Sequence, residues 1–98
     1  MARRYQLRIY TLVPERADEF VANFHRELVP LRTLYGFAVD AAFLAEDRTR
    51  FTWVTSHGGP EGWDAAERSY YDSPERKGIS FAPGDYILDH DVTMVTPA

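Results

Sequence analysis

Three histidines, His25, His57 and His90, are the side chains of this sequence best suited to acid–base chemistry near neutral pH. His25 lies at the edge of an apolar stripe with helical spacing, and His90 shares the alternation of Leu88 and Val92. Both are therefore expected to face the space between helices and a sheet. We predict that His25 or His90 transfers a proton, and the alternative is that each is a hydrogen-bonded structural histidine.

Aromatic residues form the second group with chemical potential. A pocket that they line would suit a flat aromatic molecule, because it offers stacking and burial. Ordinary core packing is the alternative, since aromatic residues also fill small cores. Trp53 is expected to orient a substrate beside the catalytic histidines. The expected substrate-binding residues are Tyr5, Arg8, Tyr10, His57, Trp63, Tyr70 and Tyr71.

Arg8 shares its strand face with Tyr10, and Asp89 and Asp91 fall in the matching phase of the last strand. A charge buried against the sheet is costly unless it is paired. Arg8 is therefore predicted to pair across strands with Asp89 or Asp91. An unpaired Arg8 would instead be free to hold a carboxylate or an enolate.

Several kinds of site have no support in the sequence. There is no cysteine, and no His-x-x-x-His or Glu-x-x-His spacing, so no metal site is expected. Gly58-Gly59-Pro60 is too short for a phosphate loop, and its proline removes a donor. No Gly-x-Ser-x-Gly elbow supports hydrolase chemistry. We expect no bound organic cofactor, with haem binding left as a further possibility.

The composition indicates one domain over residues 1–98, with 45% hydrophobic residues and a net charge of -4. Arg3, Arg4 and Arg8 are too few for a nucleic-acid footprint. No run approaches the roughly 20 apolar residues of a membrane span. The expected location is therefore the cytoplasm, without a membrane or nucleic-acid partner.

Hydrophobic periodicity then supplies the elements that must position these residues. Pro30 is expected to kink the first helix near Glu27 or Leu28. Gly36 is a suitable end for that helix. Strands are predicted over residues 5–13, 37–46, 51–57 and 86–95, helices over 14–35 and 61–71, and a short helical piece from residue 73.

This β-α-β-β-α-β order predicts an α+β, ferredoxin-like fold, with both helices on one face of a four-stranded antiparallel sheet. The other face is left open and apolar, so a second copy is expected to cover it. The residues expected on the open face are Tyr10, Leu12, Ala42, Leu44, Val54 and Val95.

Residues 5–12, Tyr-Gln-Leu-Arg-Ile-Tyr-Thr-Leu, resemble the opening strand of NIPSNAP domains, which tend to read aromatic-x-Leu-Arg-x-Tyr-x-Leu. The sequence departs from the family pattern at Arg76, where an aromatic residue often follows the Pro-Glu pair, and at residues 55–57. Both departures fall where a ligand pocket is expected. The resemblance continues through Pro14, Leu28-Val29-Pro30-Leu31, Tyr35-Gly36-Phe37, Phe51-Thr52-Trp53-Val54, Ala65-Ala66 and Tyr71-Asp72-Ser73-Pro74-Glu75.

The resemblance implies a dimeric α+β barrel, a homodimer in which two four-stranded sheets pack together. Relatives of this architecture include cofactor-independent quinone-forming monooxygenases, polyketide cyclases, lactone isomerases and haem-binding enzymes, and others have only ligand-binding or stress-response assignments. Fold alone does not choose among them. We predict a homodimer that binds a small aromatic or apolar molecule. Its predicted activity is that of a cofactor-independent cyclase, isomerase or monooxygenase, which acts on an aromatic or polyketide-like substrate in specialised metabolism. The alternative is a non-catalytic ligand-binding or stress-associated dimer.

Overall fold

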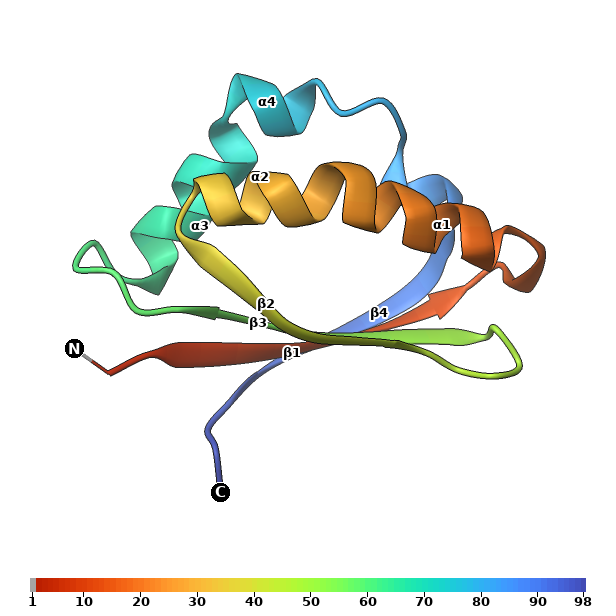
Figure 1. Cartoon of the computed structure of the whole chain (residues 1–98), viewed down its shortest axis with the longest axis horizontal. Coiled ribbons are helices and arrows are strands. Elements are labelled where there is room, and N and C mark those ends of the chain that lie inside the picture. The colour runs from red at the N-terminus through yellow and green to blue at the C-terminus, as the bar shows by residue number, and fades with distance from the viewer. Residues whose placement is uncertain (1) are drawn as a thin grey trace.

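All the helices lie on one face of a four-stranded antiparallel sheet, as the element order predicts (Figure 1). The structure is a computed structural model and describes residues 2–98. The sheet order is β2-β3-β1-β4, so the first and last strands of the chain are neighbours. The α+β ferredoxin-like fold is confirmed. The strands are β1 (Arg4–Leu12), β2 (Phe37–Leu44), β3 (Arg50–His57) and β4 (Ile87–Val95).

Two helical connections cross over the sheet. The second begins after Gly62, whose φ of 84° ends the extended chain in a conformation that favours glycine. The first connection comprises η1 (Pro14–Arg16), α1 (Ala17–Asn23), η2 (Phe24–Leu28) and α2 (Val29–Leu34), and the second comprises α3 (Trp63–Asp72), α4 (Pro74–Lys77) and η3 (Pro83–Asp85).

The first helical connection is irregular where the sequence predicts it to be. The segment η2 is a π-helical turn, and the N–H of Val29 donates to the carbonyl of Phe24, five residues back. Pro30 follows directly and has no N–H to donate. The disturbance expected near Glu27 or Leu28 therefore takes the form of a wider turn within a continuous helical rod (Figure 1).

The face assignment predicted for β1 is wrong. Tyr10 and Leu12 are 7% and 1% exposed beneath the helices, and Leu7 and Ile9 lie on the open face. Strand alternation states which residues share a face but not which face is covered. Because both faces of β1 carry apolar residues, the sequence pattern alone did not distinguish them.

Ladder irregularities also shift the predicted faces of the two edge strands. In β2 the register shifts between Val39 and Ala41, so Phe43 lies on the open face, 67% exposed, and not with Phe37. Ala42 and Leu44 pair opposite buried residues of β3 and face the helices, not the open side as predicted.

In β4 the register with β1 shifts between Thr11 and Leu12, and Leu88 is 67% exposed. Ile87 pairs with Leu12 and takes the place on the helix side that the alternation assigned to Leu88. His90 pairs with Tyr10 and faces the helices, as predicted.

The core consists of two clusters of buried side chains. One packs α1 and η2 on the sheet, where the rings of Phe20 and Phe51 meet edge to face with centroids 5.4 Å apart. The other packs α3 on the far end of β2, where Trp63 meets Phe37 with centroids 5.1 Å apart. The gap between these two clusters is where the candidate site forms.

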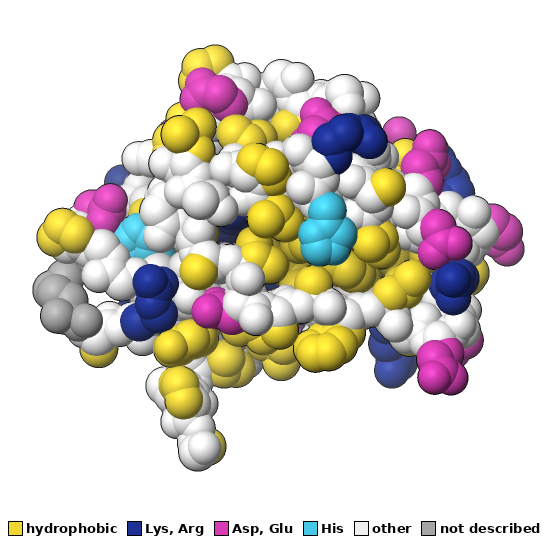
Figure 2. Space-filling view, in the orientation of Figure 1, with side chains coloured by type: hydrophobic (Ala, Val, Ile, Leu, Met, Phe, Trp, Pro, Cys, Tyr) yellow, Lys and Arg dark blue, Asp and Glu magenta, His cyan; other side chains and the backbone are white. Residues whose placement is uncertain are grey.

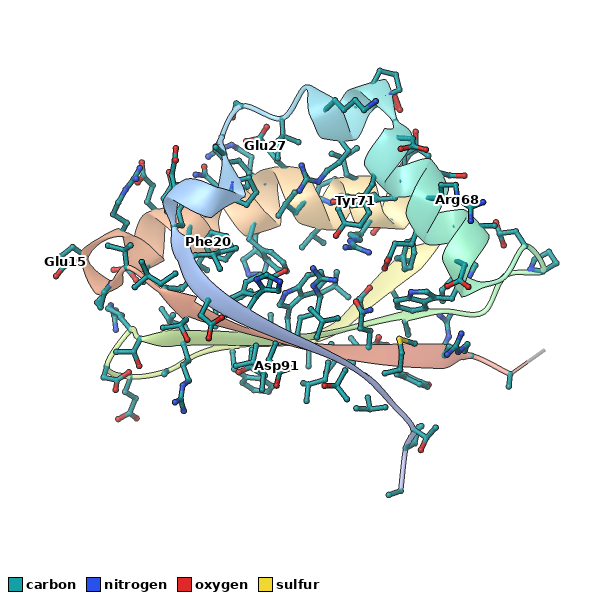
Figure 3. The ribbon with its side chains drawn as sticks, turned by 180° about the vertical axis from the view of Figure 1, so that it is seen from behind. Glu15, Phe20, Glu27, Arg68, Tyr71 and Asp91 are labelled. Carbon is teal, nitrogen blue, oxygen red and sulfur yellow. The ribbon has the colours of Figure 1, made fainter. Side chains whose placement is uncertain are left out.

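The opposite face of the sheet carries no helix among residues 2–98 (Figure 1). Hydrophobic side chains gather below the sheet in Figure 2. They alternate with hydroxyl side chains, and Asp91 of β4 lies on the same side of the sheet (Figure 3). The apolar residues on this face include Leu7, Ile9, Ala41, Phe43, Val54 and Val95.

Candidate functional site

A cavity of about 170 Å³ lies between the helices and the sheet, at the junction of the two core clusters. Side chains of β1, β3 and β4 form its floor, and α2, α3 and α4 supply its walls. The apolar part of its lining includes Phe20, Leu28 and Ile87. Six residues predicted as site residues line this cavity, namely Arg8, Tyr10, Trp53, Tyr70, Tyr71 and His90.

His90 is the one predicted catalytic histidine that the fold brings to the cavity. It is exposed on the edge strand β4, directly opposite Tyr10 in the ladder. Trp53 is 2% exposed on β3, on the other side of β1 from β4, and its ring centroid lies 6.3 Å from that of Tyr10. The indole Nε1 of Trp53 is buried without a hydrogen-bond partner in the described structure.

Four predicted site residues lie elsewhere. His25 is exposed and rests against the ring of Phe24, with centroids 5.2 Å apart. His57 is buried at the end of β3, where its Nε2 lies 3.5 Å from a carboxylate oxygen of Glu61. The other two are Tyr5, on the open face of β1, and Trp63, in the second core cluster.

Within residues 2–98 Arg8 has no carboxylate partner, so the predicted pairing with Asp89 or Asp91 is wrong. Both aspartates lie on the opposite face of β4, because Arg8 pairs with Val92 in the ladder. Its guanidinium donates instead to side chains on its own strand, with Nε 2.9 Å from the Tyr10 hydroxyl and Nη1 2.7 Å from Oε1 of Gln6. These are neutral acceptors, so the charge of Arg8 is solvated but not neutralised.

Arg32 is the most deeply buried charged residue of the cavity, 2% exposed. Its Nη2 donates to the Tyr71 hydroxyl at 3.1 Å, and its Nε and Nη1 have no hydrogen-bond partner in residues 2–98. Aromatic rings surround the guanidinium, with the centroid of Tyr70 at 4.2 Å and that of Trp53 at 5.4 Å from its carbon Cζ. Arg32 is not among the residues predicted for the site from the sequence.

The position of Arg32 depends on the π-helical turn. In an uninterrupted α-helix, residue 32 lies about 80° around the axis from residue 24. In the wider turn at Phe24–Leu28 each residue advances around the axis by a smaller angle than in an α-helix. The angle between residues 24 and 32 is therefore smaller, and Phe24, Leu28 and Arg32 all point inward and are buried. A charged residue four positions after Leu28 in an apolar stripe is the signal that would have identified it.

Arg76 completes the set of cations at the cavity. It belongs to α4, which Ser73 caps by accepting a hydrogen bond from the Arg76 N–H at 3.1 Å. The guanidinium carbon lies 5.5 Å from the Tyr71 ring centroid, and Nε is buried without a partner in the described residues. Arg76 is one of the two departures from the NIPSNAP pattern, and it does line the cavity, whereas residues 55–57 do not.

The surroundings of Arg8 and Tyr70 in the cavity raise the pKa of both groups. Burial acts to lower the pKa of Arg8, but Tyr10 and Tyr71 outweigh it, so the pKa is raised above its ordinary value. Burial raises the pKa of the Tyr70 phenol, although Arg32 acts in the opposite direction. None of the ion pairs found in residues 2–98 involves an arginine of the cavity.

Fold and cavity together define a ferredoxin-like α+β domain with an aromatic, arginine-lined pocket between helices and sheet. The chain has the fold of NIPSNAP-domain proteins, as the resemblance implies. A NIPSNAP domain protein from Burkholderia xenovorans superposes with a TM-score of 0.80 at 14% identity, covering 97% of this chain and 94% of the other. A NIPSNAP family protein from Agrobacterium tumefaciens gives 0.81 at 10% identity, covering 99% and 94%.

The same fold occurs in a candidate antibiotic biosynthesis monooxygenase from Bacteroides thetaiotaomicron, with a TM-score of 0.72 at 19% identity, covering 97% of this chain and 89% of the other. No protein-family model and no curated protein matches the sequence. In residues 2–98, no helix has the length and apolar character that crossing a bilayer requires. The same residues contain no group of three or more potential metal ligands.

Proposed function

We propose that this protein binds a small molecule with an aromatic or apolar body in the cavity between helices and sheet. The observation that carries the proposal is a cavity of about 170 Å³ lined by Trp53, Tyr10 and Tyr70. A cavity of roughly 150 Å³ with apolar walls accommodates benzene. One aromatic ring therefore matches the volume of the cavity, and the remainder of a larger polyketide-like substrate would lie outside it.

Two neighbouring residues of β4 provide a matched test of binding. Ile87 lines the cavity, whereas Leu88 is 67% exposed and outside it. Phenol, added during a 15N–1H NMR titration, is expected to shift the indole N–H of Trp53. Ile87→Trp should fill the cavity and abolish that shift, and Leu88→Trp should retain it. Retention of the shift in both variants, with their folds intact by circular dichroism, would place the ligand elsewhere.

We further propose that the bound molecule undergoes cofactor-independent proton transfer, with His90 as the base. An imidazole at the cavity edge can take a proton from an activated C–H bond, leaving the electron pair on the substrate as an enolate. Return of a proton to another atom gives isomerisation, and attack of the carbanion on a carbonyl gives cyclisation. Such steps suit an accessory enzyme of specialised metabolism, and the fold similarity to a candidate antibiotic biosynthesis monooxygenase supports this assignment.

Deuterium exchange tests the chemistry directly. Benzoylacetone carries one aromatic ring and an acidic C–H group, and exchange in D2O replaces that hydrogen without any co-reactant. His90→Gln should slow the catalysed exchange about 100-fold, a typical contribution of general acid–base catalysis. His25→Gln is the control, because His25 is exposed and outside the cavity. Equal rates in the two variants would favour the non-catalytic, ligand-binding or stress-associated dimer.

The homodimer is part of the same proposal. The open face of the sheet presents Leu7, Ile9 and Val54 side by side across β1 and β3, and Phe43 is 67% exposed on β2. An apolar sheet face of this kind is normally covered by another layer. A second copy related by a two-fold axis would supply that layer with the same residues.

A further inference from the structure

We propose that the ligand is an aromatic carboxylate, and that Arg32 and Arg76 bind its anionic group while its ring lies against Trp53 and Tyr70. This inference rests on the proposed binding function and adds the chemical class of the ligand. Arg32 is the most deeply buried charged residue of the cavity. A guanidinium that is 2% exposed and has two nitrogens without partners is costly to bury, so an acceptor that completes it would bind strongly.

The cavity contains cations and no carboxylate to balance them. Arg8, Arg32 and Arg76 all line it, and no aspartate or glutamate does. Glu67, which contributes to the raised pKa of Arg8, already accepts a hydrogen bond from Nε1 of Trp63 at 3.1 Å. An anionic ligand would therefore meet positive charge that no carboxylate of the cavity lining balances, beside the deeply buried guanidinium of Arg32.

The donors that remain free belong to groups with a planar arrangement of N–H bonds. A guanidinium N–H donates a charge-assisted hydrogen bond to a carboxylate oxygen, and such bonds are stronger than neutral hydrogen bonds. Nε and Nη1 of Arg32 and Nε of Arg76 are unpartnered within residues 2–98. The Tyr71 hydroxyl, which accepts from Arg32, still has its own proton to donate to an oxygen at the same place.

The surrounding rings stabilise the cations but offer no strong acceptor. Arg8 and Arg32 both have their carbons Cζ 5.4 Å from the Trp53 ring centroid, and Arg32 lies 4.2 Å from that of Tyr70. Cation–π contacts of this kind stabilise the guanidinium charges among the rings. They leave the N–H donors unsatisfied, which is the part that a carboxylate would complete.

Calorimetric titration with benzoate and with benzamide tests the inference. The two probes have the same ring and nearly the same shape, and they differ in charge. Wild-type protein should bind benzoate about 10- to 100-fold more tightly than benzamide, the range expected for charge-assisted hydrogen bonds. Equal affinities would overturn the inference and leave small-molecule binding in place. Failure of both probes to bind would instead overturn the proposed binding function, and the inference with it.

Matched arginine variants locate the anion. Arg32→Met should remove the preference for benzoate and leave benzamide affinity within about two-fold, since only the charged contact is lost. Arg68→Met makes the same change of charge on the outer side of α3, where Arg68 is exposed, and should change neither affinity (Figure 3). Arg76→Gln is the second variant, should Arg32→Met not fold. An equal loss of benzoate affinity in Arg76→Gln and Arg68→Met would refute the assignment.

Discussion

Replacement of Arg32 by methionine tests whether the buried guanidinium stabilises the fold or is retained at a cost. Two of its nitrogens are buried without partners, and each unmet donor costs about 1–3 kcal/mol, or roughly 4 kcal/mol for the pair. Methionine removes both donors and fills a similar volume with an adaptable side chain. The wild-type residue is therefore expected to carry a stability penalty that the variant lacks.

The interactions that the variant loses have a similar magnitude. One charge-assisted hydrogen bond to Tyr71 contributes about 1.5–3 kcal/mol, and desolvated cation–π contacts contribute on the order of 2 kcal/mol. The stability gained by removing the unmet donors nearly cancels the stability lost with the hydrogen bond and the cation–π contacts. The methionine variant also avoids the cost of burying a charge, which favours it further. We expect the free energy of unfolding of Arg32→Met to lie between the wild-type value and about 2 kcal/mol above it.

Urea unfolding followed by tryptophan fluorescence measures this difference, at one fixed protein concentration because the stability of the proposed dimer would depend on concentration. For a chain of this length, 1 kcal/mol corresponds to a change of about 4–8 °C in Tm. Arg32→Ala is the control: it removes the same donors but leaves a void, so it should lie about 2 kcal/mol below Arg32→Met. A loss above about 3 kcal/mol in Arg32→Met would show that Arg32 is structurally satisfied, and would refute the reasoning.

Three further predictions follow from other contacts. Hydrogen bonds donated by Ser80 hold the pKa of Glu27 below its ordinary 4.5. Glu27 therefore stabilises the fold above pH 4.5, and this contribution is lost as the pH falls through the lowered pKa. Glu27→Gln should flatten the acid limb of a curve of unfolding free energy against pH. Ser73→Ala removes the N-cap of α4 and should cost about 1 kcal/mol in urea unfolding, whereas Ser69→Ala on the exposed side of α3 should cost little. Val54→Lys places a charge on the open sheet face and should convert the proposed dimer to a monomer in light scattering, with Ser69→Lys as the control; a variant that stays dimeric would exclude sheet-to-sheet association.

The elements of the fold were predictable because each has a local cause. Alternation of apolar residues predicted β3 over residues 51–57, and it spans Arg50–His57. Pro14 and Pro30 marked the start and the irregular turn of the first helical connection. The second helix begins at Trp63, later than residue 61, because Gly62 adopts a positive φ directly before it.

The assignment of faces was less predictable, because it depends on pairing between distant strands. Tyr10 and Leu12 were expected on the open side and are buried under the helices. The register shifts opposite Thr11 in β4 and after Val39 in β2 each reverse the alternation of the residues beyond them. A bulge adds one residue to one strand only, so the alternation of that strand cannot locate it.

The candidate site was half predictable for a related reason. Residues of the strands, such as Trp53 and His90, were identified because their types suggested chemistry and their phase was correct. Arg32 was not, because an arginine two residues after Pro30 in an amphipathic helix is ordinarily assigned to the solvent side. The π-helical turn contributes to this orientation, because it brings Arg32 closer to the phase of Phe24 and Leu28. The turn that accommodates a helix-breaking proline thus also places a cation among aromatic rings, so the backbone irregularity and the chemistry of the cavity have one cause. Restoring a regular helix would therefore be expected to change the ligand preference of the cavity as well as the shape of the helix.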